Sequence, residues 1–276
     1  MKNKKRLLII AIIFLVILVP LIWLLAWGNK AIALTEYTVQ SDSLPESFNG
    51  FRILQVSDLH NDEFGENNEK LLSMMEKAEA DIIVITGDTI DSYGTEVEIA
   101  KSFLEKASEI APCYYVTGNH EGRLPSAFEE LSEYIEELGI TVLRGQSVTI
   151  EKGSDTINIM GIDDPNFGRS VKDSLSEGLP DGYTVLLSHR PENFKEYVDA
   201  GVDLVFCGHA HGGQFILPFI GGVYAPGQGL DPQYFSGIHT EKNTSMIVSR
   251  GLGNSVFPLR INNRPELVVV ELWCEE

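Results

Sequence analysis

Five short apolar segments of this chain each end directly at a cluster of polar residues, and this repetition constrains the fold more than any other feature. The segments run over residues 51–57, 81–86, 113–117, 183–187 and 202–207. The polar clusters that follow begin at Asp58, Gly87, Gly118, Ser188 and Gly208. Short apolar strands that end at polar residues are typical of open α/β sheets, in which ligands bind outside the carboxyl ends of the strands.

Helical patterns lie between these predicted strands. Apolar residues recur at i, i+3 and i+4, opposite acidic faces, over residues 67–80, 95–110, 126–138 and 191–200. Further strands are predicted over residues 147–150, 156–161, 245–249 and 267–272. Because helices must pack on strands and strands on strands, we predict an α/β fold, a four-layer α-β-β-α sandwich of two mixed sheets flanked by helices.

The polar clusters have a composition that suits metal binding. They are Asp58-Leu59-His60, Gly87-Asp88-Thr89-Ile90-Asp91, Gly118-Asn119-His120-Glu121, Ser188-His189-Arg190 and Gly208-His209-Ala210-His211. Five of the six histidines of the chain lie in these clusters. Together with the aspartates and the asparagine they supply enough ligands for two divalent metals, and mixed nitrogen and oxygen donors suit manganese, iron or zinc. We therefore predict a binuclear metal site at the carboxyl ends of the strands.

Each of these residues also has an ordinary structural explanation when it is taken alone. Asp58 or Asp88 would serve as a helix N-cap after a strand, and His209 or His211 would be a surface or core histidine. These explanations do not account for five such clusters at five strand ends. Arg190 is expected to begin a helix at the surface, and contact with a phosphate oxygen is the alternative.

The order of the motifs resembles that of the calcineurin-like metallophosphoesterase family. Asp-x-His, Gly-Asp-x-x-Asp, Gly-Asn-His-Glu, a lone His and Gly-His-x-His follow one another from Asp58 to His211. The run Gly212-Gly213-Gln214 and the stretch from Ser249 to Glu266 are similar to the membrane-associated bacterial phosphodiesterase branch of that family. The resemblance covers about residues 50 to 273.

The resemblance implies two metal ions that share the Asp88 carboxylate. The ligands of one metal would be Asp58, His60, Asp88 and His211. The ligands of the other would be Asp88, Asn119, His189 and His209. Independently of the resemblance, one carboxylate with two oxygens can bridge metal ions about 3.5–4 Å apart.

His120 is expected to act on the substrate rather than on a metal. It is one residue past a predicted ligand, so its side chain should point away from that metal. The resemblance implies that it steadies or protonates the leaving oxygen during in-line attack on phosphorus by a metal-activated hydroxide. Glu121 is expected either to orient this imidazole or to cap the next helix. Asn61 and Asp91 are expected beside the ligands.

The N-terminal segment determines the predicted compartment. Residues 7–27 carry no charge and, at about 1.5 Å per residue, are long enough to cross a hydrocarbon core of about 30 Å. The basic cluster over residues 1–6 should stay cytoplasmic. We therefore predict a single-pass signal anchor in the cell membrane over residues 7–27, a linker over residues 28–48, and an extracytoplasmic metallophosphoesterase domain over residues 49–276. Cleavage of a signal peptide after Ala33 is the alternative.

The charge of the chain argues against nucleic acid as a partner. The segment from Ala31 onward holds 16 basic and 40 acidic residues, a net charge of −24. Such a field repels nucleic acid and anionic lipid headgroups. Cys113, Cys207 and Cys274 are odd in number, and the first two lie in apolar runs, where a free thiol behaves as a small buried hydrophobe.

The motifs predict a phosphoester substrate without naming it. Membrane anchoring with outward topology favours phosphodiesters or pyrophosphates of the envelope, either lipid-linked or wall-linked. A phosphomonoesterase of the same fold is one alternative. A noncatalytic metal-binding ectodomain is another, although it would be expected to have lost a ligand or His120. The apolar segment 215–220 is expected to form a buried strand and turn, with a lipid-facing lip beside the site as the alternative.

Overall fold

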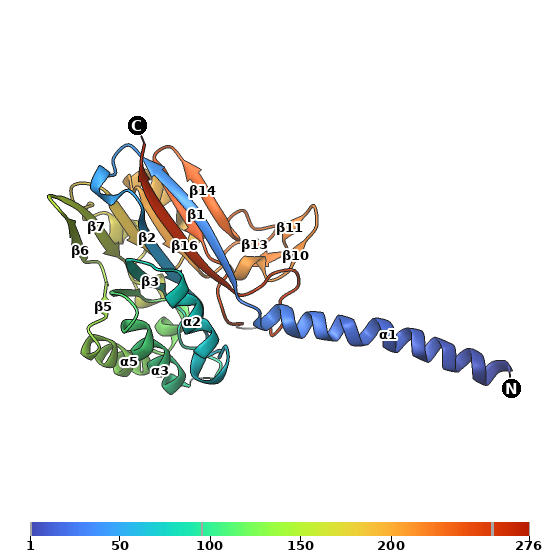
Figure 1. The fold of residues 1–276 in the computed structure, drawn as a ribbon. Helices are drawn as coiled ribbons and strands as arrows, with labels where there is room; N and C mark the ends of the chain where they lie inside the picture. Colours follow the sequence, from blue (N-terminus) through green and yellow to red (C-terminus); the bar gives the residue numbers. More distant parts are fainter. Residues whose placement is uncertain (1, 95, 255–256, 276) are drawn as a thin grey trace.

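Two six-stranded mixed sheets lie face to face in the computed structural model, which describes residues 2–94, 96–254 and 257–275 (Figure 1). In spatial order, the first sheet contains β1 (Ala33–Ser41), β16 (Glu266–Cys274), β2 (Phe51–Val56), β3 (Ile82–Thr86), β4 (Cys113–Val116) and β5 (Thr141–Val142). The second sheet contains β14 (Gly237–Glu241), β15 (Thr244–Val248), β9 (Leu204–Cys207), β8 (Thr184–Leu187), β7 (Asp155–Gly161) and β6 (Ser147–Lys152). Met1, Thr95 and Glu276, at which predicted segments begin or end, lie outside the described residues.

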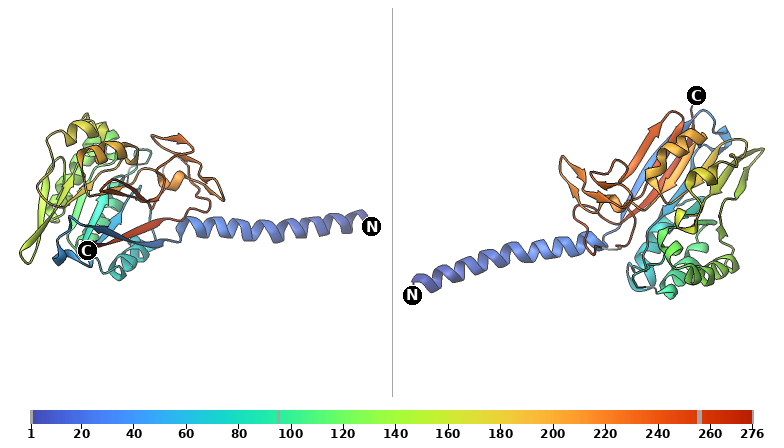
Figure 2. Two further views of the ribbon diagram at one scale, coloured as in Figure 1. Left: turned by 90° about the horizontal axis from the view of Figure 1, so that it is seen from above. Right: turned by 180° about the vertical axis from the view of Figure 1, so that it is seen from behind.

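Helices cover both outer faces, and the predicted four-layer sandwich is confirmed (Figure 2). The helices over the first sheet are α2 (Glu69–Lys77), α3 (Val97–Ser108) and α5 (Pro125–Glu137). Those over the second sheet are α6 (Val171–Leu175) and α7 (Phe194–Ala200). Between the sheets, side chains such as Ile53 and Val84 share one apolar cluster with Val185 and Phe206. Burial on both faces explains why the central strands are continuous apolar runs.

Shorter elements complete the chain. The helix α4 (Asn119–Arg123) follows β4 directly. Two small hairpins, β10 (Ile216–Leu217) with β11 (Gly221–Gly222) and β12 (Tyr224–Ala225) with β13 (Gly229–Leu230), follow the last polar cluster. Single 3₁₀ turns lie at Glu46–Phe48, Glu66–Asn68, Pro165–Phe167, Pro191–Asn193 and His211–Gly213.

The strand directions bring all five polar clusters to one edge of the sandwich. In the first sheet β2, β3 and β4 are parallel neighbours. In the second sheet β7, β8, β9 and β15 are parallel neighbours. Parallel strands end at the same edge, so the residues that follow them converge although they are far apart in the sequence.

The segment predicted as a linker over residues 28–48 is largely structured, which corrects that prediction. Its residues 33–41 form β1, an edge strand that runs parallel to β16 over nine residue pairs. Alternate side chains along most of β1 are more exposed, as in a strand with one covered face. The prediction missed β1 because its only partner in the sheet lies more than 220 residues later in the chain.

The helix α1 (Lys2–Lys30) extends away from the domain (Figures 1 and 2). Its segment Lys4–Lys30 is long and apolar enough, by length and composition, to cross a membrane. Most of its described side chains are exposed. Pro20 lies inside the helix.

Candidate metal centre

Two groups of buried side chains with metal-ligating atoms meet at the edge of the sandwich. Asp58, His60 and His211 form the first group. Asp88, His189 and His209 form the second group. Within each group the ligand atoms lie within 4.8 Å of one another. Each group combines residues from the ends of both sheets, so neither exists before the two sheets pack together.

Asp88, a member of the second group, also faces the first group. Its Oδ2 atom is 3.1 Å from Nε2 of His189 and 3.7 Å from Nε2 of His60. Its Oδ1 atom accepts a hydrogen bond from the backbone amide of His120 at 2.7 Å. A single carboxylate therefore faces an imidazole of each group, as a bridging ligand must.

Oδ1 of Asn119, a buried atom of a predicted ligand, has no hydrogen-bond partner. An unpaired buried polar atom costs about 1–3 kcal/mol, and a metal ion would satisfy it. Nδ1 of His189 bonds to the carbonyl oxygen of Thr86 at 2.7 Å, which turns Nε2 toward Oδ2 of Asp88 at 3.1 Å. The donor set of carboxylates, one amide and imidazoles fits a dinuclear divalent metal site.

The backbone is strained at most of the predicted ligands. Five of them have φ between 47° and 65°, namely Asp58, His60, Asp88, His209 and His211. This left-handed conformation costs a non-glycine residue roughly 1–2 kcal/mol and concentrates at functional sites. Here it turns the chain sharply after β2, β3 and β9, so that the side chains converge instead of following the strand direction.

Glycines next to the predicted ligands make room for the carboxylates. A Cβ atom added to Gly118 would lie 2.3 Å from Oδ1 of Asp88. One added to Gly208 would lie 2.4 Å from Oδ2 of Asp58. Any side chain at these positions would displace a carboxylate, which explains why glycine precedes the polar residues in both motifs.

Burial and the neighbouring carboxylates set the charges of the imidazoles. Burial lowers the pKa of His60 to about 4 and that of His211 to about 3, so both are neutral at pH 7. Burial also lowers the pKa of His209 well below its usual range. Burial opposes protonation of His189 too, but the Asp88 carboxylate outweighs it and raises the pKa of His189 to about 10. Without metal, His189 and Asp88 therefore form a buried ion pair.

Glu121 caps α4 and holds the loop that carries Asp88. Its buried carboxylate accepts hydrogen bonds of 2.8 Å from the backbone amides of Gly118, Asp88 and Thr89. Of the two roles expected from the sequence, capping is therefore the one observed. The carboxylate also joins the segment that follows β3 to the segment that follows β4, a link that the sequence did not predict.

Asp91, rather than Glu121, lies against the His120 imidazole. Its Oδ1 atom is 3.1 Å from Nδ1 of His120, and the amide nitrogen of Ser92 lies 2.9 Å from the same ring nitrogen. The other oxygen of Asp91 is 4.0 Å from Nδ1 of His60. The ring is thus held through Nδ1, and its Nε2 atom lies 4.0 Å from Oδ2 of Asp88.

Arg190 lies inside the site, which corrects its predicted place at the surface. Its side chain is only 16% exposed. Its Nε atom donates to Oδ2 of Asp164 at 2.5 Å, and its Nη1 atom contacts Nε2 of His209 at 2.8 Å. Asp164 was not predicted either, although it follows β7 at the same edge as the other clusters. The rule used for the other strand ends would have found it.

Two further polar side chains brace the loops around the groups. Asn61 donates to the carbonyl oxygen of Gly94 at 2.7 Å. Arg260 is buried, donates to the carbonyl oxygen of Gly253 at 2.6 Å, and lies 3.4 Å from Nδ1 of His211. No local pattern marks Arg260, because its burial depends on loops that meet only in the folded chain.

Comparison with known proteins decides the family. Residues 51–213, more than half of the chain, match the family model of the calcineurin-like phosphoesterases. The chain belongs to the calcineurin-like phosphoesterase family. The resemblance predicted from the motifs is confirmed, and membership implies a phosphoester hydrolase.

Relatives of this phosphoesterase align along most of its length. It is 32% identical to the uncharacterized metallophosphoesterase YkuE of Bacillus subtilis, and the alignment covers 86% of this chain and 84% of YkuE. It is 29% identical to the phosphodiesterase YaeI of Escherichia coli, with 80% and 82% covered. A transmembrane protein with a metallophosphoesterase domain from Danio rerio is 28% identical, with 86% of this chain and 56% of that protein covered.

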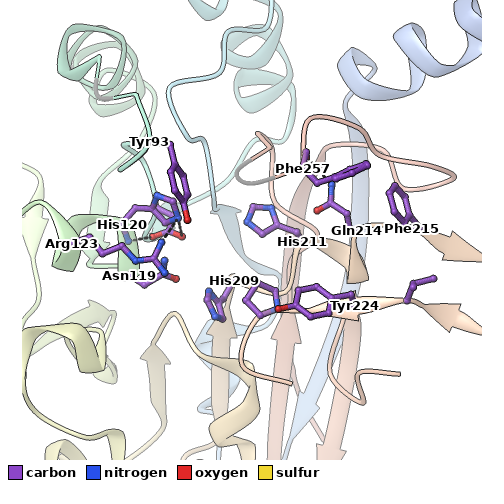
Figure 3. A pocket seen from close by; sticks show the side chains of 13 residues that line it. Tyr93, Asn119, His120, Arg123, His209, His211, Gln214, Phe215, Tyr224 and Phe257 are labelled. Atoms are coloured by element: carbon purple, nitrogen blue, oxygen red, sulfur yellow. Dashed lines mark hydrogen bonds and ion pairs between the residues drawn. The ribbon is translucent and has the colours of Figure 1, made fainter. Parts of the chain in front are cut away.

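A cavity of about 560 Å³ opens over the candidate metal centre of this phosphoesterase (Figure 3). One wall carries Tyr93, Asn119, His120 and Arg123. The opposite wall carries Gln214, Phe215, Tyr224 and Phe257. His209 and His211 lie between the two walls (Figure 3). The cavity is therefore polar on one side of the histidines and largely apolar on the other.

We expect metal binding to this phosphoesterase at pH 7 to release a proton from His189. The proton on Nε2 and a metal ion compete for the same lone pair, and the pKa of about 10 keeps the proton bound at pH 7. Below that pKa, the apparent affinity for metal should rise by up to about tenfold for each unit by which the pH is raised. Calorimetric titrations in two buffers of different ionisation enthalpy measure the proton. Identical heats in both buffers would contradict the prediction, and His189→Gln should abolish this proton release.

Proposed function

We propose that this protein is a membrane-anchored, binuclear metal-dependent phosphodiesterase that hydrolyses phosphodiester or pyrophosphate substrates of the cell envelope. The observation that carries the proposal is the pair of adjacent ligand groups beneath an open cavity, with Asp88 of one group facing His60 of the other. The similarity to YaeI, which is named a phosphodiesterase, supports a diester over a monoester.

The proposed metal ligands are those that the family resemblance implies. For one ion they are Asp58, His60, Asp88 and His211. For the other they are Asp88, Asn119, His189 and His209. Two divalent ions, when bound, supply the positive charge that neutralises phosphoryl oxygens and lowers the pKa of water. Manganese, iron and zinc are all compatible with this mixture of donors.

The other side chains of the cavity would hold the substrate and the leaving oxygen. Arg123, with Nη1 at 3.3 Å from Nε2 of His120, places a positive charge on the polar wall for a phosphoryl oxygen. We propose that Nε2 of His120 donates a proton to the leaving oxygen as its bond to phosphorus breaks. Asp91, at Nδ1 of the same ring, keeps the imidazole in this orientation. Water, which loses a proton to the solvent, attacks phosphorus opposite the leaving oxygen while the bond from phosphorus to that oxygen breaks, without a covalent enzyme intermediate.

Hydrolysis of bis-p-nitrophenyl phosphate and of p-nitrophenyl phosphate by the full chain in detergent tests this function. Metals are stripped and then added back singly. Metal-dependent cleavage of the diester is the expected result. Preference for the monoester would favour a phosphomonoesterase, and two bound metals without cleavage of either compound would favour a noncatalytic metal-binding ectodomain.

We expect His120→Ala to retain both metals while turnover falls by about 10²–10⁴-fold. The loss should be greatest for diesters whose leaving groups have a high pKa, because these depend most on a proton donor. Turnover against leaving-group pKa, with metal content per chain, measures both effects. His239→Ala, which removes the histidine on β14, should change neither. Metal content that falls in step with turnover would assign His120 to the metals instead.

We further propose that α1 anchors the protein in the cell membrane with the catalytic domain extracytoplasmic. The basic residues before the apolar segment favour a cytoplasmic N-terminus. The similarity to a protein named as transmembrane supports an anchor. Protease added to intact cells with a permeable wall should degrade the domain, whereas full protection would place the domain in the cytoplasm.

A further inference from the structure

An apolar rim borders one side of the cavity and continues to the end of α1. We define the apolar rim as the exposed side chains of Leu217, Phe219, Ile220, Phe257, Leu259 and Ile261. Phe219, between β10 and β11, is fully exposed, and Ile220 is 66% exposed. The sequence favoured a buried strand and turn for this segment, so these two residues correct that prediction. Exposed apolar patches of this kind mark interaction surfaces.

Direct contacts join the two segments of the apolar rim, residues 217–220 and residues 257–261. Gln214 donates its side-chain amide to the carbonyl oxygens of Phe257 and Leu259, at 3.1 and 2.7 Å. The amide of Ile216 donates to the carbonyl oxygen of Ile261 at 3.0 Å. The rim is therefore one surface, although its segments lie about forty residues apart in the sequence.

The same surface is fastened to the end of α1. The side chain of Asn29 accepts a hydrogen bond from the backbone amide of Arg260 at 2.7 Å and donates to its carbonyl oxygen at 3.2 Å. Arg264 lies over the ring of Trp27 at 5.0 Å and donates to the carbonyl oxygen of Ala31 at 2.8 Å. The β10–β11 hairpin lies on the same side of the domain as α1 (Figures 1 and 2). These contacts hold the rim where α1 would leave a bilayer.

The apolar rim also leads into the cavity. Phe215 and Phe257 line the cavity, and their ring centroids are 5.1 Å apart in an edge-to-face contact. An apolar path therefore runs from the rim to the ligand groups, whereas Arg123 and His120 occupy the opposite wall. This division matches an amphiphilic molecule, with its apolar chains along the rim and its phosphoester over the metals.

We infer that the apolar rim inserts into the surface of the bilayer that α1 spans, and that the substrate is a phosphodiester or pyrophosphate borne by a membrane lipid. This inference rests on the proposed function and narrows its substrate class. The domain has a net charge of −24 and would be repelled by anionic lipid headgroups. Residues 215–222 carry no charge, so their insertion into the bilayer does not depend on the charge of the headgroups. Continuity with α1 favours a bilayer over a second copy of the chain as the partner of the rim.

Fluorescence quenching tests the membrane contact independently of the reaction. The full chain with Cys274→Ser and Phe219→Cys is labelled with an environment-sensitive fluorophore in phosphatidylcholine nanodiscs. Cys113 and Cys207 are buried and should remain unlabelled. Lipids with a spin label near the headgroup should quench the fluorophore at position 219. The matched control is Trp273→Cys with Cys274→Ser, an exposed position at the other end of β16, where no quenching is expected.

Two outcomes of this measurement would overturn the membrane contact. One is equal quenching, or none, at positions 219 and 273. The other is a cross-link between the cysteines at position 219 of two copies without lipid quenching, which would assign the rim to an interface between copies of this chain.

Turnover of two diesters with the same leaving group tests the substrate class. Phosphatidyl-p-nitrophenol in nanodiscs presents the bond in a lipid, and bis-p-nitrophenyl phosphate presents it in water. The Phe219→Ser, Ile220→Ser variant should cleave the lipid about tenfold more slowly, because interfacial binding scales with the buried apolar area. It should cleave the soluble diester at the unchanged rate, since neither side chain lines the cavity. Trp273→Ser should change neither rate.

Equal effects on both diesters, or no effect on the lipid, would overturn the lipid substrate. If the unmodified chain with its metals cleaves neither diester, the proposed phosphodiesterase activity fails. The quenching measurement would still decide whether the apolar rim meets the membrane, so the two failures are distinguishable.

Discussion

Asp88→Asn should lower the turnover of bis-p-nitrophenyl phosphate by roughly 10³-fold or more. The carboxylate faces one imidazole of each ligand group, at 3.1 Å from His189 and 3.7 Å from His60. An amide has no negative charge and only one oxygen, so it cannot bridge two cations. It also removes the carboxylate that raises the pKa of His189. The expected loss therefore includes metal content as well as rate.

Turnover together with elemental analysis of metals per chain measures both effects. The matched control is Asp231→Asn, because Asp231 also has a left-handed backbone, with φ of 54°, but is exposed. The control should retain full metal content and rate. Undiminished turnover by Asp88→Asn, with two metals bound, would show that the proposed site does not require the Asp88 carboxylate.

Glu121→Ala should lower the free energy of unfolding by at least about 3 kcal/mol, the largest effect on stability that we expect. The buried carboxylate accepts hydrogen bonds from the backbone amides of Asp88, Thr89 and Gly118 and from the hydroxyl group of Tyr115. Each donor left unpaired in the interior costs about 1–3 kcal/mol. The loop that carries Asp88 would lose its support, so metal affinity should fall together with stability.

Chemical unfolding of the metal-free chain in detergent, followed by circular dichroism, measures this change. Glu121→Gln keeps the volume but turns an amide donor toward backbone donors, so its stability should lie between those of the unmodified chain and Glu121→Ala. Glu133→Ala, at an exposed position on α5, should differ by less than about 0.5 kcal/mol. A stable Glu121→Ala protein with normal metal binding would show that the loop is held by other contacts.

Expectations drawn from short stretches of sequence agreed with the structure wherever the residues of that stretch alone explain the strand or helix that forms. β3 is buried at every position, and its continuous apolar run is visible without a partner. The helix α5 begins at Pro125, where proline is favoured in the first turn, and its apolar residues share one face. Asp88 and His209 follow such strands, so their convergence was predictable from strand direction alone.

Expectations failed where the cause lies elsewhere in the chain. Arg190 follows His189 and precedes a proline, which is compatible with an exposed helix start. It is largely buried because Asp164, from the end of another strand, neutralises its charge. Glu121 is adjacent to His120 in sequence, yet its carboxylate turns to the amides of the Asp88 loop, and Asp91 takes the place beside the imidazole.

The sequence by itself determined the central strands and the main helices, the family, and the seven predicted ligands from Asp58 to His211 that converge. These depend on local apolar periodicity and on motifs that follow strands directly. Only the tertiary structure decided which charges are paired, that β1 joins β16, and that Phe219 and Ile220 remain exposed beside the end of α1. The physical reason is that burial and pairing depend on atoms from distant segments, and a local pattern shows what a segment can bury but not what will cover it.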